Sequence, residues 1–329
     1  MKRKVLFLVP VVLGAVVWFV ALVLWMPGRS HAGPPERMNA HQQEIQAQLV
    51  AHVTKLAGDI GERNTPKSLA TAIAYIESEL RRDQLVVTEQ HYTALGGNFT
   101  NIEGELKGSE HPEQIIIVCG HYDSVQGSPG ANDNGSGAAA VLELARQFGQ
   151  AKVKPKSTIR FVLFGTEEPP YFGTEGMGSY SYAARCQAQR QNIAAVVVLE
   201  TLGYYTDAPR TQEYPPLLRN FLPDTGNFIA FVANPASRQL LERCVGEFRA
   251  TTGFPSEGVA PPDAVPGVDW SDQLYFWKFG YPAVMVTDTA PYRYPHYHKL
   301  TDTPDKLNYP AFARVVGGIQ KVVAKLANS

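Results

Sequence analysis

The stretch IIIVCGHYDSV, residues 115–125, joins a buried strand to two polar side chains. Its apolar run from Ile115 to Val118 is typical of a β-strand, and a glycine ends it. His121 and Asp123 follow, and in an extended chain two residues that are two positions apart lie on one face. Asp123 is therefore placed to accept the second ring N–H of His121, as a carboxylate does behind a metal-binding histidine.

The same pattern, an apolar run or a loop that delivers acidic or imidazole side chains, recurs along the chain. GANDNGSG (130–137) is a glycine-rich turn before a predicted helix, and Asp133 within it can bridge two ions with its two oxygens. TIRFVLFGTEE (158–168) ends on two glutamates, of which one can bind metal while its neighbour takes a proton from a metal-bound water. The remaining candidates are Glu200 in AAVVVLETLGY (194–204) and His298 in YPHYHKLTDTPDKLNY (294–309).

Together these side chains predict a site for two metal ions. The carboxyl ends of the strands in an open α/β sheet form the ligand crevice, so groups at strand ends meet there. Burying unpaired carboxylates is costly, and a pair of divalent cations supplies the compensating charge. Single motifs such as HxD arise by chance, but the conjunction is specific. Five histidines lie in polar or helical contexts and are predicted to stand outside the site, namely His31, His41, His52, His91 and His111, whereas His296 is an alternative to His298.

The segments between the motifs predict an α/β fold. Strand-like runs alternate with helix-like stretches, which favours a three-layer αβα sandwich with a mainly parallel, mixed central sheet. The segment 85–106 alternates weakly and predicts antiparallel edge strands, and Thr65-Pro66 begins a helix. Strands are expected at 115–119, 159–164, 194–200, 228–233 and 282–287, and helices at 136–149, 178–191, 236–251 and 271–279, with a further apolar helical stripe at 312–326.

Composition narrows the possible functions. The net charge is −1 and no basic block occurs, so the chain has no electrostatic footprint for nucleic acid. Three cysteines are too few for a disulfide scaffold. Cys119 lies in an apolar run and is expected to be buried, whereas Cys186 and Cys244 could pair in an oxidising compartment.

The N-terminus predicts the compartment. Three basic residues precede an uncharged apolar stretch, Val5 to Met26, which at about 20 residues is long enough to span a bilayer. Residues 1–26 are therefore expected to anchor the chain in a membrane, with the body outside the cytoplasm. A cleaved signal peptide that ends at Ser30-His31-Ala32 is the alternative. Residues 27–38 are a predicted linker and residues 39–329 a catalytic domain.

These motifs resemble those of the M28 family of zinc aminopeptidases, and the chain looks like a bacterial-type member that consists of the catalytic domain alone. The resemblance spans about residues 40–329. The motifs that carry it are GHYDSV (120–125), GANDNGSGAAAVLELAR (130–146), FGTEEP (164–169), LETLGY (199–204) and HKLTDTPDKL (298–307).

The resemblance implies a zinc-exopeptidase fold and a pair of zinc ions bridged by Asp133. One ion would be further bound by Glu168 and His298, and the other by His121 and Glu200. The H-x-x-x-D-T spacing, which is similar to the last ligand motif of the family, favours His298.

The resemblance also implies the chemistry. Glu167 would be the general base, Asp123 would support His121 as part of the catalytic apparatus, and the substrates would be peptides with a free N-terminus. Two departures from the family pattern stand out. Glu200 occupies a position where many members have aspartate, and Ser271-Asp272-Gln273 replaces the usual Ser-Asp-His.

Two other functions are compatible with the sequence. A glutaminyl cyclase, a transferase of similar fold, uses a single zinc ion, but this chain keeps both candidate ligands of a second metal. A non-catalytic, membrane-tethered binding ectodomain predicts eroded ligands, and none is missing. The proline-rich stretch 203–227 follows Glu200 and is expected to wall the substrate cleft, where Tyr204, Tyr205 and Tyr214 either line a specificity pocket or simply pack.

Overall fold

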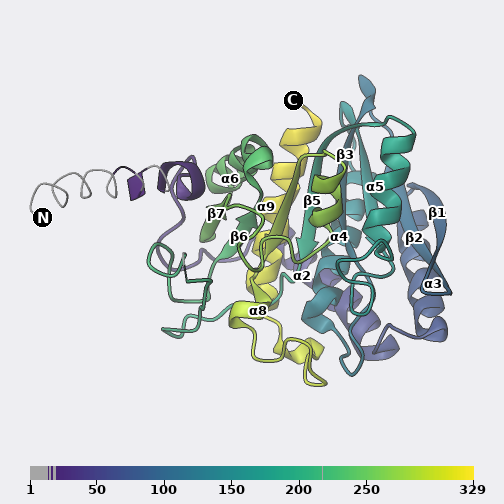
Figure 1. The fold of residues 1–329 in the computed structure, drawn as a ribbon, viewed down its shortest axis with the longest axis horizontal. Helices are drawn as coiled ribbons and strands as arrows, with labels where there is room; N and C mark the ends of the chain where they lie inside the picture. Colours follow the sequence, from purple (N-terminus) through teal and green to yellow (C-terminus); the bar gives the residue numbers. More distant parts are fainter. Residues whose placement is uncertain (1–13, 15, 18–19, 217) are drawn as a thin grey trace, which may run out of the picture.

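A mixed sheet of eight strands forms the middle layer of the computed structural model, which describes residues 14, 16, 17, 20–216 and 218–329 (Figure 1). The order is β1-β2-β4-β3-β5-β8-β6-β7. The central four strands run parallel, β1 and β2 form an antiparallel edge, and β6 with β7 is antiparallel to β8. The strands are β1 (Val86–Ala94), β2 (Gly97–Leu106), β3 (His111–His121), β4 (Ser157–Phe164), β5 (Asn192–Glu200), β6 (Ile229–Val232), β7 (Ser256–Val259) and β8 (Ala283–Thr287).

Helices cover both faces of the sheet, so the predicted three-layer α/β sandwich is confirmed (Figure 1). One face packs against α2 (Ala40–Val53), α3 (Pro66–Arg82), α4 (Gly137–Gly149), α6 (Arg238–Thr251) and α9 (Tyr309–Ala327). The other packs against α5 (Gly178–Ala188) and α7 (Gln273–Lys278), while the short α8 (Ala290–Arg293) follows β8.

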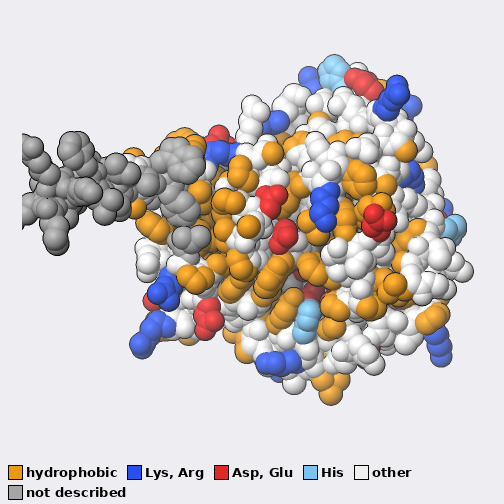
Figure 2. All heavy atoms as spheres, in the orientation of Figure 1, with side chains coloured by type: hydrophobic (Ala, Val, Ile, Leu, Met, Phe, Trp, Pro, Cys, Tyr) orange, Lys and Arg blue, Asp and Glu red, His pale blue; other side chains and the backbone are white. Residues whose placement is uncertain are grey.

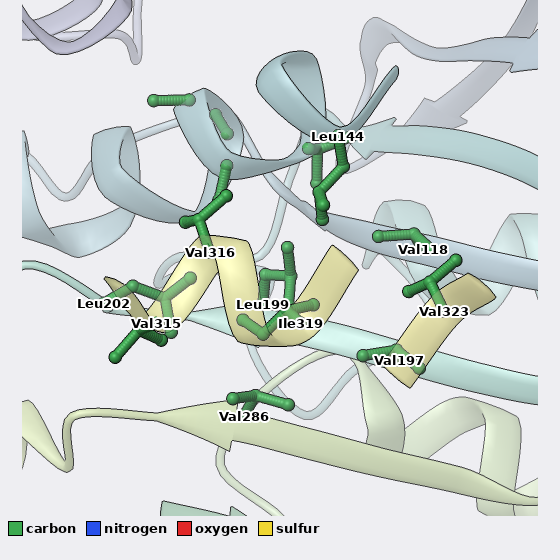
Figure 3. Close-up of a cluster of buried hydrophobic side chains, with 14 of the residues drawn as sticks. Val118, Leu144, Val197, Leu199, Leu202, Val286, Val315, Val316, Ile319 and Val323 are labelled. Atoms are coloured by element: carbon green, nitrogen blue, oxygen red, sulfur yellow. The ribbon is translucent and has the colours of Figure 1, made fainter. Parts of the chain in front are cut away.

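The period of two along each strand explains this division, because successive side chains point to opposite faces. In β3, Ile116 and Val118 belong to the core under α4 and α9, whereas Ile117 faces α5. Figure 3 shows Val323 of α9 beside Val118 and Val197, and Ile319 of α9 beside Leu199. The apolar runs of the central strands are therefore buried on both sides, as expected for parallel strands.

The expected elements are found with boundaries shifted by a few residues, and α2, β7 and the short α8 appear in addition. Thr65 caps α3 and Pro66 is its first residue, as predicted, and the segment 85–106 forms the antiparallel pair β1–β2. The sequence gives no clear signal for β7, which has a single large apolar residue, Val259. The sequence also contains only a weak signal for α2, because the three buried aliphatic residues of this helix are separated mainly by polar residues.

A long connection replaces a helix on one face of β6 and β7. Because β6 runs antiparallel to β8, the chain that leaves the end of β5 enters β6 at the same edge of the sheet and needs no crossover helix. Residues 201–228 contain no strand and no helix among the described positions, which exclude residue 217. The apolar side chains on this face of β6 and β7 are covered instead by this connection and by residues near the N-terminus.

The predicted membrane span lies mostly outside the described residues, but its last part, Val20–Met26, is described and packs against the domain. Val23 is 5% exposed, and its carbonyl accepts a hydrogen bond of 3.0 Å from the N–H of Ala260, just after β7. Gly258 makes room for Met26, since a Cβ at Gly258 would lie 2.7 Å from the Met26 Cγ. Among the described residues, no helix combines the length and the apolar character needed to cross a membrane.

The three cysteines are free thiols. Cys119, on β3, is fully buried, as expected. Cys186 lies on α5 and Cys244 on α6, in cores on opposite faces of the sheet, so the possible disulfide between them does not form.

A fully buried arginine, Arg63, ties together the loops on which the site is built. Its backbone N–H donates to Ser124 Oγ, and Ser124 N–H donates back to the Arg63 carbonyl. Burial lowers the pKa of the guanidinium to about 10, so it remains charged at neutral pH. The guanidinium faces five carbonyl oxygens, at distances of 2.6 to 3.1 Å, in Leu56, Gly61, Tyr122, Pro129 and Gly130.

Removing this side chain should destabilise the protein strongly. Arg63→Ala would leave several buried carbonyls without donors, and we expect it to lower the free energy of unfolding by about 3–5 kcal/mol. The matched control is Arg81→Ala, because Arg81 is exposed and makes one ion pair with Glu77, which should contribute less than about 1 kcal/mol. Urea unfolding of both variants measures the difference, and similar midpoints would contradict the role given to Arg63.

Candidate metal centre

Three neighbouring strands deliver acidic and imidazole side chains to one edge of the sheet. His121 is the last residue of β3, Glu200 is the last residue of β5, and Glu167 and Glu168 follow β4. All four are buried, with exposed fractions between 0% and 9%. Since β4, β3 and β5 are adjacent and parallel, their carboxyl ends lie together, as the sequence predicts.

Asp133 stands between two histidines from distant parts of the chain. Its Oδ1 lies 3.4 Å from His121 Nε2, and its Oδ2 lies 3.0 Å from His298 Nε2. Glu200 Oε2 lies 3.3 Å from the same nitrogen of His121, and Glu168 Oε2 lies 3.4 Å from the same nitrogen of His298. The ligand atoms thus form two groups, His121–Asp133–Glu200 and Asp133–Glu168–His298, which share Asp133, and a third, overlapping group joins His121, Glu167 and Glu168.

These groups fit two divalent cations. Each contains one imidazole nitrogen and two carboxylates, a donor set that suits zinc. His121 Nε2 is buried and has no hydrogen-bond partner in the described part of the chain, although three carboxylates surround it. A bound cation would satisfy this nitrogen and would neutralise the carboxylates at the same time.

Asp123 orients both His121 and the glutamate loop. Its Oδ1 lies 3.2 Å from His121 Nδ1, the pairing that the HxD spacing predicts. Its two oxygens also accept hydrogen bonds from the backbone N–H groups of Glu167 and Glu168, at 3.1 to 3.2 Å. One buried carboxylate therefore holds a histidine on β3 in register with the loop after β4.

Asp302 holds the loop that carries Asp133. Its oxygens accept the backbone N–H groups of Asn132 and Asp133, at 2.8 and 3.1 Å, and the hydroxyl of Tyr294 at 2.7 Å. The H-x-x-x-D-T spacing draws attention to Asp302, but this contact with a loop far away in the sequence is visible only in the structure. Asp302 thereby links the His298 segment to the shared ligand.

The segment Ser271-Asp272-Gln273, which departs from the family pattern at Gln273, lies beside Glu200. Ser271 Oγ donates a hydrogen bond of 2.6 Å to Glu200 Oε2, so it orients the carboxylate of this candidate ligand. Gln273 donates to the Val268 carbonyl. Asp272 is fully buried, and burial raises the pKa of its carboxyl to about 7. The sequence alone gives no indication of the contact between Ser271 and Glu200.

Crowding of carboxylates perturbs their protonation. Burial, together with repulsion from neighbouring carboxylates, raises the pKa of Glu167 and of Glu168 well above the ordinary value. Burial acts in the same direction on Asp133, but the two imidazoles of His121 and His298 beside it outweigh burial and lower the pKa of Asp133. Burial lowers the pKa of His121, and the negative charges of Glu200 and Glu167 reverse the effect and raise it.

The structure separates the site histidines from the others. His298 is stacked on Tyr297, with ring centroids 3.9 Å apart, and reaches Asp133. His296 instead pairs with Thr301 Oγ1 at 2.9 Å. Of the remaining histidines, His52 is bonded to Tyr75 and His91 to Thr100, and His31, His41 and His111 also lie outside the metal-ligand groups found among the described residues.

A cavity of about 90 Å³ lies beside Glu200, over the face of the sheet that lacks a covering helix. Figure 2 shows the molecule with a histidine at a hollow that contains acidic side chains and with apolar side chains around it. The floor of the cavity includes Ala230, Val232 and Met285, and the 201–228 connection forms a wall with Leu218. Of the three tyrosines predicted for this region, Tyr214 lines the cavity, whereas Tyr204 packs against Tyr294 and Tyr205 against Phe254.

Comparison with known proteins identifies relatives of this fold and site. The model of Peptidase family M28 matches residues 101–323. The Escherichia coli K12 protein described as "Uncharacterized protein YfbL" is 32% identical over 322 residues, which cover 95% of this chain and 94% of that protein.

Two solved structures share the fold at low identity. BSAP, a zinc aminopeptidase from Bacillus subtilis, is 15% identical with a TM-score of 0.66, over 89% of this chain and 97% of that one. The Fimbriiglobus ruber glutaminyl cyclase is 22% identical with a TM-score of 0.62, over 89% of this chain and 97% of that one. Because the family model covers most of the chain and the Escherichia coli relative covers nearly all of it, the chain belongs to peptidase family M28.

Proposed function

We propose that this M28 peptidase is an aminopeptidase that holds two zinc ions and uses Glu167 as its general base. The main support for the proposal is the position of Asp133. Each of its two oxygens lies close to a different histidine, and a glutamate lies beside each of these histidines. Such a shared carboxylate suits a site for two metals, in which paired ions activate a water and polarise the scissile carbonyl.

Glu167 is placed to move the proton. Its Oε2 lies 3.9 Å from His121 Nε2, so the carboxylate borders the space enclosed by the ligands. Its backbone is fixed by Asp123, which keeps the side chain aimed at this space. A carboxylate in this position takes the proton of the attacking water and delivers it to the leaving amine.

The apolar cavity beside Glu200 supports action at a chain end. A substrate whose N-terminal amino group lies near Glu200 would place its first side chain over Met285 and Val232. Burial of an apolar side chain there would add binding energy. We therefore propose that the enzyme releases apolar N-terminal residues from peptides.

Replacing the base should separate metal binding from turnover. Glu167→Gln keeps size and shape but cannot accept the proton, so we expect two zinc ions per chain and a fall in kcat of roughly 10²–10⁴-fold. Asp133→Ala removes the shared ligand and should lose both zinc and activity. Metal analysis and hydrolysis of leucine p-nitroanilide measure the two effects, and full activity of Glu167→Gln would show that another group is the base.

The alternative function is that of a glutaminyl cyclase, because the Fimbriiglobus ruber glutaminyl cyclase has a similar fold. The presence of the second ligand group, His121–Asp133–Glu200, favours the peptidase. We expect two zinc ions per chain, release of leucine from leucyl peptides, and no cyclisation of glutaminyl peptides. One zinc ion together with pyroglutamate formation would establish the transferase instead.

We also propose that residues 1–26 attach the catalytic domain to a membrane, on the side away from the cytoplasm. A span needs roughly 17–25 residues, so insertion would draw on part of Val20–Met26 and release it from β7. We expect the chain in carbonate-washed membranes to retain Met1. A soluble form that begins at Gly33 would demonstrate cleavage of a signal peptide instead.

A further inference from the structure

We propose that a second, larger cavity beside Glu168 binds the part of the substrate that follows the scissile bond, and that the preferred substrates are therefore peptides of more than two residues. This inference rests on the proposed aminopeptidase function and specifies its substrate class. The cavity measures about 710 Å³, which is within the range of roughly 300–1,000 Å³ that ligand sites occupy.

The order of the strands places the two cavities on opposite sides of the metal ligands. The apolar cavity includes Glu200 and extends over β8, β6 and β7. The larger cavity includes Glu168 and Asp123 and extends past β4 toward the β1–β2 hairpin. A peptide with its first residue near Glu200 and its scissile carbonyl at the candidate metal ligands would reach this cavity by continuing toward the hairpin.

The walls of the larger cavity suit an uncharged peptide chain. They come from the first half of α3, the start of β2, and the loops after β3 and β4. Asn64, Asn98 and Gln126 offer amide groups that can both donate and accept hydrogen bonds to a peptide backbone, and Ile73 and Phe99 offer apolar surface. The mixture resembles the lining of sites that bind a main chain and tolerate varied side chains.

The charge of the lining disfavours a free carboxylate. The charged side chains that line the cavity are Glu62, Asp123 and Glu168, and no lysine or arginine is among the lining residues. The N-terminus of α3 contributes a partial positive charge, but Thr65 already caps the Ser68 N–H. A dipeptide, whose carboxylate would lie one residue past the scissile bond, therefore finds the negative charge of Glu62 and no lysine or arginine to receive that carboxylate, whereas a longer peptide carries its carboxylate away.

The first test compares substrates on the zinc-loaded, full-length enzyme. For Leu-Ala, Leu-Ala-NH2 and Leu-Ala-Ala-Ala-NH2 we expect kcat/KM to rise along the series, with the tetrapeptide amide about tenfold or more above Leu-Ala, mainly through KM. Glu62→Gln keeps an oxygen that can accept from Gly127 N–H and removes the charge, so it should reduce the preference for the amide over the acid dipeptide about threefold.

A matched pair of variants locates the binding site. Ala70 and Ala74 are both exposed on α3, but only Ala70 lines the cavity. Ala70→Trp should raise KM for the tetrapeptide amide about tenfold and raise KM for leucine p-nitroanilide, whose leaving group extends only one ring past the scissile bond, by less than about threefold, whereas Ala74→Trp should affect neither. Asn98→Trp, on the opposite wall of the cavity, should have the same effect as Ala70→Trp. The second variant keeps the test valid if one of the two proteins misfolds.

The outcomes are distinguishable from failure of the proposed function. Hydrolysis of leucine p-nitroanilide without any length preference, or equal effects of Ala70→Trp on both substrates, would overturn the cavity assignment alone. Absence of hydrolysis of every compound by the zinc-loaded enzyme would overturn the aminopeptidase function and this inference with it.

Discussion

The structure depends on the burial of five carboxylates, Asp123, Asp133, Glu167, Glu168 and Glu200, around a single edge of a sheet. Isolated charges in such surroundings are unfavourable by several kcal/mol each, and proteins tolerate them only when they are paired, hydrogen-bonded or bound to metal. Two histidines supply part of the positive charge that pairs with these carboxylates. The raised pKa values of Glu167 and Glu168 show that, without a cation, these two groups tend to bind protons instead. Bound divalent cations would resolve this constraint and would leave the carboxylates unprotonated.

Holding these groups together requires interactions that reach across the fold. Parallel strands bring His121, Glu167 and Glu200 to one edge, but Asp133 and His298 lie on loops whose positions the sheet does not determine. Arg63 joins the loop after β3 to the loop before Asp133, while Asp302 joins Asp133 to the His298 segment. Both side chains are buried with several hydrogen bonds, so the ligand positions are set before any cation binds, which lowers the entropic cost of assembling the site.

The sequence predicts what local patterns and motif order encode, and it misses what long-range contacts create. The apolar runs identify β3, β4 and β5 because parallel strands are buried on both faces. In contrast, β7 contains one large apolar residue and exists by pairing with β6. The candidate ligands follow from strand ends and from loop motifs in the sequence, but the roles of Arg63 and Ser271 do not. Their partners lie many residues away, and nothing in their immediate neighbours marks them as buried.

The asymmetry of the cleft follows from one reversal of strand direction. Where β6 turns antiparallel to β8, the chain returns to the sheet without a crossover helix, and the face of β6 and β7 is left to an irregular connection and a small apolar cavity. On the other side of the metal ligands, α3 and the β1–β2 hairpin stand apart and enclose a larger, more polar cavity. A small apolar recess suits one side chain, and a larger, more polar one suits a continuing main chain. The direction that we propose for a peptide across the candidate metal centre would therefore be a consequence of sheet topology, and it is the direction that removal of an N-terminal residue requires.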